Sequence, residues 1–146
     1  MMIGKPGVSD IEWSNVSSAS STGAQVDVLV VDDDEGLRST WADIFTSSGY
    51  SVAVAEDGDV ALRLLQQMAV GVVLLDLRMP RRDGFSVLES LTDPQLVVLV
   101  SARSLDDATL ERVEGKIVTY LEKPVPPERL LATVAATLGR SAVAGN

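Results

Sequence analysis

The residues of this chain that could do chemistry are mostly acidic, and three of them directly follow or close apolar runs. Asp32 and Asp33 come after the run 26–31, and Asp76 closes the run 70–76. Short runs of β-branched residues and leucine are typical of strands buried within a parallel sheet. Ligands of such sheets bind at the carboxyl ends of the strands. If these strands are neighbours, the carboxylates meet and repel, and a hard divalent cation with oxygen ligands would relieve that repulsion.

Two more polar residues stand at the ends of apolar runs. Ser101 closes the run 96–101, and Lys123 follows the run 117–121 with one residue between. Ser101 by itself would be an ordinary serine at the end of a strand. Four of five predicted strands nevertheless end in polar residues that would share one edge of a sheet, and this pattern favours a site.

The acidic run 32–35 has a simpler explanation when it is taken alone. Such runs are usually charged helix N-termini, which the helix dipole favours. Because Asp32 and Asp33 match polar residues at three other strand ends, we interpret these two as site residues. Asp34 and Glu35 are assigned to the start of a helix.

Amphipathic stretches separate the apolar runs. In the first of them, Leu37, Trp41, Ile44 and Phe45 recur at helical spacing and form a stripe that would pack on a core. The predicted strands are 26–31, 50–55, 70–76, 96–101 and 117–121, and the predicted helices are 34–48, 57–68, 85–91, 105–114 and 126–138. Five strands that alternate with five helices predict an α/β fold with a parallel sheet covered on both faces. The helix 105–114 lacks a clean apolar stripe, so we expect it to be poorly anchored.

Composition limits the size of the fold and the kinds of partner. A chain of 146 residues that is 46% hydrophobic can bury one good core, which predicts one domain. We expect a flexible Ser/Gly-rich leader at 1–24, the domain at 25–140 and a short tail at 141–146. The formal charge of −9 argues against nucleic acid and anionic membranes as partners of this domain, since both require basic patches.

The chain contains no cysteine and no histidine. These absences exclude disulfides and thiolate chemistry, and they remove the commonest general base and the commonest nitrogen ligand for metals. Carboxylates, lysine and hydroxyl groups are left for chemistry. No apolar stretch reaches membrane-spanning length, and the N-terminus lacks a basic start followed by an apolar core. A cytoplasmic location is therefore expected.

The pattern resembles the receiver domain of bacterial two-component response regulators over about 26–138. The resemblance rests on the acidic pair, Asp76-Leu77-Arg78-Met79-Pro80 with Asp83-Gly84, Ser101-Ala102, and Tyr120-Leu121-Glu122-Lys123-Pro124. It implies a flavodoxin-like (βα)5 three-layer sandwich whose five parallel strands have the order 2-1-3-4-5. It also implies a cis peptide bond between Lys123 and Pro124.

The resemblance implies a phosphoacceptor and a Mg²⁺ site. Asp76 would be the carboxylate nucleophile that takes a phosphoryl group as an acyl phosphate, which is known carboxylate chemistry. Asp33, Asp76 and the backbone carbonyl of Arg78 would ligate Mg²⁺ directly. Asp32 would hold the ion through water.

The resemblance also assigns the remaining polar residues. Ser101 and Lys123 would bind phosphoryl oxygens, as phosphoryl transfer requires neutralisation of those oxygens. Tyr120 matches an aromatic that turns inward when Ser101 shifts, although by itself it would be a half-buried strand residue. The output surface would be the fourth helix, the fifth strand and the fifth helix.

The absence of histidine implies an external phosphodonor. The resemblance places that histidine on a sensor histidine kinase or a histidine phosphotransfer protein. The chain would not be an enzyme, except that it would catalyse its own phosphorylation and dephosphorylation. Phosphorylation is also expected to allow a second copy of the chain to bind as a homodimer.

Two other functions compete with this interpretation. An aspartate-nucleophile phosphatase of the haloacid-dehalogenase type needs an acid/base aspartate two residues after the nucleophile, where this chain has Arg78. A pseudo-receiver would act as an interaction module without phosphorylation. The complete set of three aspartates, a serine and a lysine argues against it.

Overall fold

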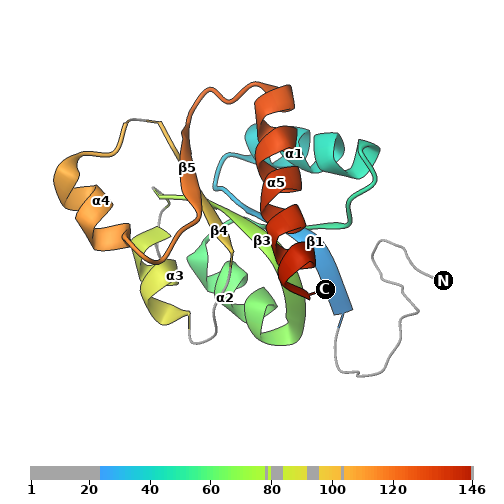
Figure 1. Cartoon of the computed structure of the whole chain (residues 1–146), viewed down its shortest axis with the longest axis horizontal. Coiled ribbons are helices and arrows are strands. Elements are labelled where there is room, and N and C mark those ends of the chain that lie inside the picture. Colours follow the sequence, from blue (N-terminus) through green and yellow to red (C-terminus); the bar gives the residue numbers. More distant parts are fainter. Residues whose placement is uncertain (1–23, 78, 80–83, 92–95, 103, 146) are drawn as a thin grey trace.

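The computed structural model describes residues 24–77, 79, 84–91, 96–102 and 104–145. It contains five strands and five helices that alternate along the chain (Figure 1). The strands are β1 (Ala24–Val31), β2 (Val52–Ala55), β3 (Met68–Asp76), β4 (Val97–Ser101) and β5 (Thr119–Glu122). The helices are α1 (Glu35–Ser47), α2 (Gly58–Gln67), α3 (Gly84–Ser90), α4 (Asp107–Val113) and α5 (Pro127–Gly145).

All four strand pairings are parallel, and the sheet has the order β2-β1-β3-β4-β5. This order confirms the predicted doubly wound α/β fold. Parallel neighbours require a crossover connection, and each crossover here carries one helix. Because all strands run the same way, their carboxyl ends lie along one edge of the sheet.

The core consists of two layers, one on each face of the sheet. Alternate residues of a strand point to opposite faces, so Val28 and Val30 of β1 pack with α1 and α5, while Leu29 and Val31 pack on the other face. The α1–α5 layer includes Trp41 of α1. The other layer joins α2, α3 and α4 to the sheet. Figure 1 shows the two helical layers with the sheet between them.

The central strand β3 lets α5 approach closely at Gly71. A Cβ atom at this position would lie 2.6 Å from Leu138 Cδ2 and 2.8 Å from the carbonyl oxygen of Asp27. Any larger residue would therefore displace the Leu138 side chain and press on the β1 backbone at Asp27. This close packing orients α5, which follows directly on the segment that carries Lys123.

Aspartates cap the N-termini of three helices, α1, α2 and α4. Asp34 caps α1 by accepting a hydrogen bond from the Leu37 N–H (3.1 Å), and Asp57 caps α2 by accepting from the Val60 N–H (2.9 Å). Each bond satisfies one of the N–H groups left free at a helix start. The assignment of Asp34 to a helix start is confirmed.

The observed elements differ in detail from those expected. α5 continues through Gly145, past the expected domain boundary at 140. α4 is shorter than expected, and Val113 is the only one of its residues that is buried. All but one of the residues expected to form the leader lie outside the described part of the chain. Within that part, no helix is long and apolar enough to span a membrane.

Candidate functional site

The site lies where the carboxyl ends of β1, β3, β4 and β5 meet. Asp32 follows β1, Asp76 closes β3, Ser101 closes β4, and Lys123 follows β5. β3 pairs with both β1 and β4, so Asp76 stands in the middle of this rim. The parallel arrangement therefore brings these four predicted site residues to one edge of the sheet.

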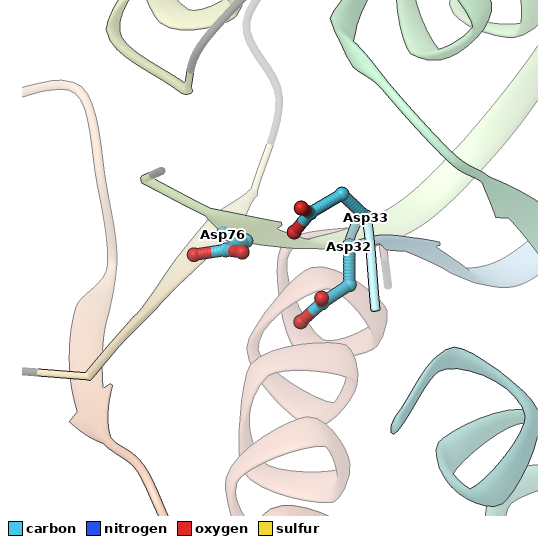
Figure 2. A group of neighbouring side chains, drawn as sticks. All are labelled: Asp32, Asp33 and Asp76. Carbon is cyan, nitrogen blue, oxygen red and sulfur yellow. The ribbon is translucent and has the colours of Figure 1, made fainter. Parts of the chain in front are cut away.

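Three carboxyl groups converge at the rim. Carboxylate oxygens of Asp32, Asp33 and Asp76 all lie within 4.8 Å of one another. Figure 2 shows the three side chains turned toward a common space. Asp32 is fully buried, Asp76 is 6% exposed, and Asp33 is open to solvent. Like charges this close repel, and a cation would stabilise the group.

The chemistry of these donors suits a hard divalent cation. All the candidate ligands are oxygen atoms, and the chain has neither histidine nor cysteine to offer nitrogen or sulfur. Carboxylate oxygens are the ligands that Mg²⁺ and Ca²⁺ prefer. The exposed side chain of Asp33 leaves a solvent side through which an ion could enter with bound water.

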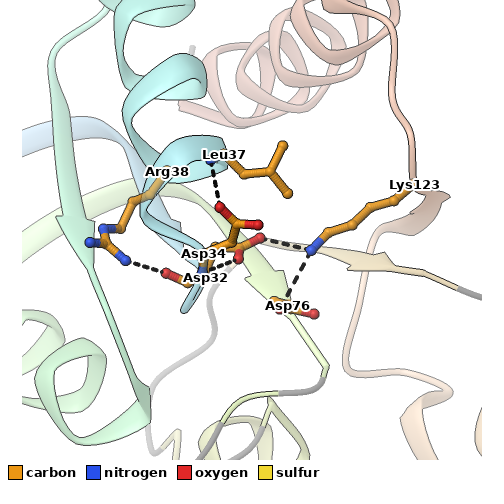
Figure 3. Close-up of polar contacts among 6 residues, drawn as sticks. All are labelled: Asp32, Asp34, Leu37, Arg38, Asp76 and Lys123. Atoms are coloured by element: carbon orange, nitrogen blue, oxygen red, sulfur yellow. Dashed lines mark hydrogen bonds and ion pairs between the residues drawn. The ribbon is translucent and has the colours of Figure 1, made fainter.

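The Lys123 ammonium pairs with two carboxylates of this cluster. Its ammonium lies 2.9 Å from Asp32 Oδ2 and 3.5 Å from Asp76 Oδ2 (Figure 3). Burial lowers the pKa of Lys123, but the hydrogen bonds and charges of Asp32 and Asp76 outweigh burial and raise the pKa above its ordinary value. The ammonium is thus charged at neutral pH. The ammonium therefore offsets part of the repulsion among the clustered carboxyl groups.

Asp32 is the most tightly held of the three acids. Its Oδ1 accepts a hydrogen bond from the Asp34 N–H (2.9 Å), and its Oδ2 accepts one from Lys123. Its backbone carbonyl accepts a third from Arg38 Nη1 (2.8 Å). These bonds join the end of β1 to the start of α1 and fix the direction of the Asp32 carboxylate (Figure 3).

Gly84 packs directly on the backbone of the proposed phosphoacceptor. A Cβ atom at Gly84 would lie 2.6 Å from the carbonyl oxygen of Asp76 and 2.8 Å from Leu77 Cα. The Gly84 N–H donates to the Leu77 carbonyl oxygen (3.0 Å). The chain therefore returns over the end of β3 at the start of α3, which explains why glycine stands in the Asp83-Gly84 pair.

Ser101 and Lys123 are linked through the backbone. Ser101 is buried, and its carbonyl oxygen accepts a hydrogen bond from the Lys123 N–H (2.6 Å). The peptide bond between Lys123 and Pro124 is cis, as expected. Tyr120 is partly buried on β5 and packs against the core layer of α2, α3 and α4. Arg78 lies outside the described residues, so a role for its carbonyl stays a prediction.

Sequence reasoning missed two residues near the site. Trp41 was assigned to core packing alone, yet the Lys123 ammonium stands 5.9 Å from the centroid of its ring. Arg38 was not singled out, although its guanidinium binds the Asp32 carbonyl. Neither residue carries a signal in the sequence, because both contacts depend on how α1 sits against the rim.

The fold and the site together define an open α/β protein with an acidic, lysine-bridged pocket at the carboxyl edge of its sheet. The family model for the response regulator receiver domain matches residues 28–135. The chain therefore belongs to the response regulator receiver domain family of two-component systems.

Curated relatives agree with this assignment. "Response regulator MprA" from Mycobacterium sp. (strain KMS) is 39% identical over 122 residues, which cover 80% of this chain and 52% of that protein. "Transcriptional regulatory protein CpxR" from Klebsiella pneumoniae is 37% identical over 119 residues, with 78% and 50% covered. The chain thus spans about half the length of these relatives.

Solved structures show the same fold. The receiver domain of the Francisella response regulator 1452 superposes with a TM-score of 0.74 at 29% identity, and the match covers 80% of this chain and 98% of that one. A CheY-like receiver domain protein from Methanospirillum hungatei JF-1 gives 0.70 at 30% identity, with 77% and 94% covered. The predicted receiver fold is confirmed.

Proposed function

We propose that this chain is the phosphoacceptor of a two-component phosphorelay and is phosphorylated on Asp76 in a Mg²⁺-dependent reaction. The observation that carries the proposal is the meeting of Asp76 with Asp32, Asp33 and the Lys123 ammonium at one rim. The phosphodonor would be a phosphohistidine of a sensor histidine kinase or a histidine phosphotransfer protein, since this chain has no histidine of its own.

Asp76 has the chemistry of the nucleophile. One of its carboxylate oxygens would form a bond to phosphorus while the bond from phosphorus to the donor's imidazole nitrogen breaks, and the electron pair leaves with the imidazole. Such transfers need positioning and neutralisation of the phosphoryl oxygens more than covalent help. Lys123, with its ammonium 3.5 Å from Asp76 Oδ2, can pair with a phosphoryl oxygen after small movement.

The three aspartates suit different roles toward Mg²⁺, which would neutralise phosphoryl charge when bound. Asp33 is exposed and Asp76 stands in the middle of the rim, so both can offer an oxygen directly. Asp32 already accepts hydrogen bonds on both carboxylate oxygens. It suits contact through water, and the Arg78 carbonyl would complete the protein ligands.

The signalling face would be α4, β5 and α5. A phosphoryl group on Asp76 would attract the Ser101 hydroxyl and shift the segment that follows β4. That segment is tied to β5 by a hydrogen bond from the Ser104 hydroxyl to Glu122 Oε1 (2.8 Å). α4 buries only Val113 among its residues, which makes it easy to displace. Tyr120 on β5 would turn inward in response.

We infer that the chain catalyses only its own phosphorylation and dephosphorylation. A homodimer formed through the signalling face on phosphorylation is part of the same proposal. The competing function is a pseudo-receiver, which would use the same surface without phosphorylation. A cytoplasmic location stays a prediction.

Intact mass spectrometry separates these functions. The native chain is incubated with Mg²⁺ and acetyl phosphate or phosphoramidate, beside Asp76→Asn and the exposed control Asp43→Asn on α1. We expect a labile gain of one phosphate in the native chain and in Asp43→Asn, and none in Asp76→Asn or without Mg²⁺. A native chain that gains no phosphate would favour the pseudo-receiver.

A further inference from the structure

Trp41 of α1 contributes an aromatic wall to the pocket that holds Lys123. The Lys123 ammonium lies 5.9 Å from the centroid of the Trp41 ring. Ammonium groups within about 6 Å of an indole face are attracted to its negative centre, and the attraction grows as water is excluded. Trp41 is 4% exposed and the Lys123 side chain 18%, so little water competes.

The indole is held in place by the core and not by the site. Trp41 packs in the α1–α5 layer with Phe45, Leu121 and Leu130. Leu121 lies two residues before Lys123 on β5. The ring therefore has a fixed position relative to β5, the strand that Lys123 directly follows.

Lys123 needs such a fixed partner because its other two partners, Asp32 and Asp76, are also proposed to interact with Mg²⁺ or the phosphoryl group. Asp32 and Asp76 hold the ammonium in the resting pocket, but both are proposed to face Mg²⁺, and Asp76 is proposed to carry the phosphoryl group. A lysine side chain has four flexible carbons and about 2 kcal/mol of rotamer entropy to lose. The indole is the one contact among these three that neither the ion nor the phosphoryl group would occupy.

We propose that Trp41 is a positioning residue for Lys123: its indole face holds the ammonium beside Asp76 while the ammonium changes partner from Asp32 to a phosphoryl oxygen. The second half of this statement rests on the proposed function. The first half, the contact in the resting protein, does not.

The contact has a spectroscopic signature that does not depend on phosphorylation. Protons near an indole face resonate upfield because of the ring current. We expect the ε-methylene protons of Lys123 to be displaced upfield in the full native chain without Mg²⁺. The displacement should disappear in Trp41→Leu and persist in part in Trp41→Phe. Leu65→Ala, a core truncation on α2 in the layer on the other face of the sheet, should leave it unchanged.

The kinetic test uses the same variants with Mg²⁺ and acetyl phosphate, well below their melting temperatures. Loss of the aromatic contact in Trp41→Leu should slow phosphorylation of Asp76 by about 2- to 5-fold. Trp41→Phe should recover most of the native rate, and Leu65→Ala should match the native rate although it also lowers the melting temperature.

The outcomes are distinct. If the Lys123 resonances do not differ between the native chain and Trp41→Leu, the contact is absent and the proposal is wrong. If the resonances move but Trp41→Leu and Leu65→Ala react equally fast, Trp41 does not position the lysine for transfer. If the native chain takes up no phosphate at all, the proposed function fails while the resonance comparison still decides whether the contact exists.

Discussion

Lys123 and Asp32 are 91 residues apart in the chain, and their side chains form an ion pair of 2.9 Å whose carboxylate is fully buried. The distance from the same ammonium to Asp76, the proposed phosphoacceptor, is 3.5 Å. In the resting pocket, then, the lysine is bound more closely to the end of β1 than to the nucleophile. Phosphorylation would require it to exchange one partner for another.

Removal of the lysine charge should destabilise the fold. In Lys123→Met, Asp32 stays buried and keeps only the Asp34 N–H as a donor to its carboxylate among the bonds described. A buried carboxylate that loses its cation typically costs about 3 kcal/mol in the free energy of unfolding. Urea unfolding in Mg²⁺-free buffer measures the loss, and added Mg²⁺ should restore part of it. Lys116→Met, at an exposed lysine, serves as the control. Equal urea midpoints for the two variants would show that the ion pair adds nothing.

Asp33→Asn should have opposite effects without and with Mg²⁺. Without the ion, the change relieves repulsion from two carboxylates within 4.8 Å and should raise the free energy of unfolding by about 1 kcal/mol. With Mg²⁺ at 100 times its dissociation constant, the free energy of unfolding of the native chain should rise by about 2.7 kcal/mol. The same Mg²⁺ concentration should raise the free energy of unfolding of the variant far less. Thermal unfolding across a Mg²⁺ titration tests both statements, and the same Mg²⁺ response in both chains would exclude Asp33 as a ligand.

Gly84→Ala should damage the site through the backbone. The new Cβ would press on the Asp76 carbonyl and Leu77 Cα, and neither is the end of a flexible side chain. Overpacking of this kind costs about 1–3 kcal/mol, and it should also slow phosphorylation because it displaces the end of β3. Gly139→Ala on α5 is the matched control, since a Cβ there meets nothing within 4 Å. The free energy of unfolding of this control should rise by about 0.5–1 kcal/mol, because alanine favours the helix more than glycine does. Equal stabilities for the two variants would contradict the packing seen at Gly84.

The cap of α4 should weaken in acid. The hydrogen bond from Thr109 to the Asp106 side chain lowers the pKa of this carboxyl below its ordinary value of 3.8. A lowered folded-state pKa means that the cap stabilises the native chain above pH 3.8 and that this stability is lost as the pH falls through the lower, folded-state value. Asp106→Asn keeps a neutral cap at every pH. The difference in melting temperature between the two chains should shrink or reverse in that acid range, and a constant difference would contradict the prediction.

Local sequence explains most of the elements but not all of their ends. The expected strand at 50–55 begins at Val52 instead, because the Tyr50 N–H donates to the Phe45 carbonyl oxygen (3.0 Å) and belongs to the end of α1. Gly49, with φ of +95°, lies just past the end of that helix, a place where glycine is favoured. Apolar alternation alone could not locate the point at which the chain leaves the helix cap and enters the sheet.

The sequence by itself determined the α/β alternation, the central place of the run that ends in Asp76, and the polar residues at the strand ends. These are local properties: side-chain periodicity, helix caps and the residue that follows each buried run. Only the tertiary structure decided that Lys123 pairs first with Asp32, that Gly84 presses on the Asp76 backbone, and that the Trp41 ring faces the lysine. Each of these three contacts joins elements that are separate in the chain. Each depends on how the helices and loops pack against the sheet, and the spacing of residues along the chain does not determine that packing.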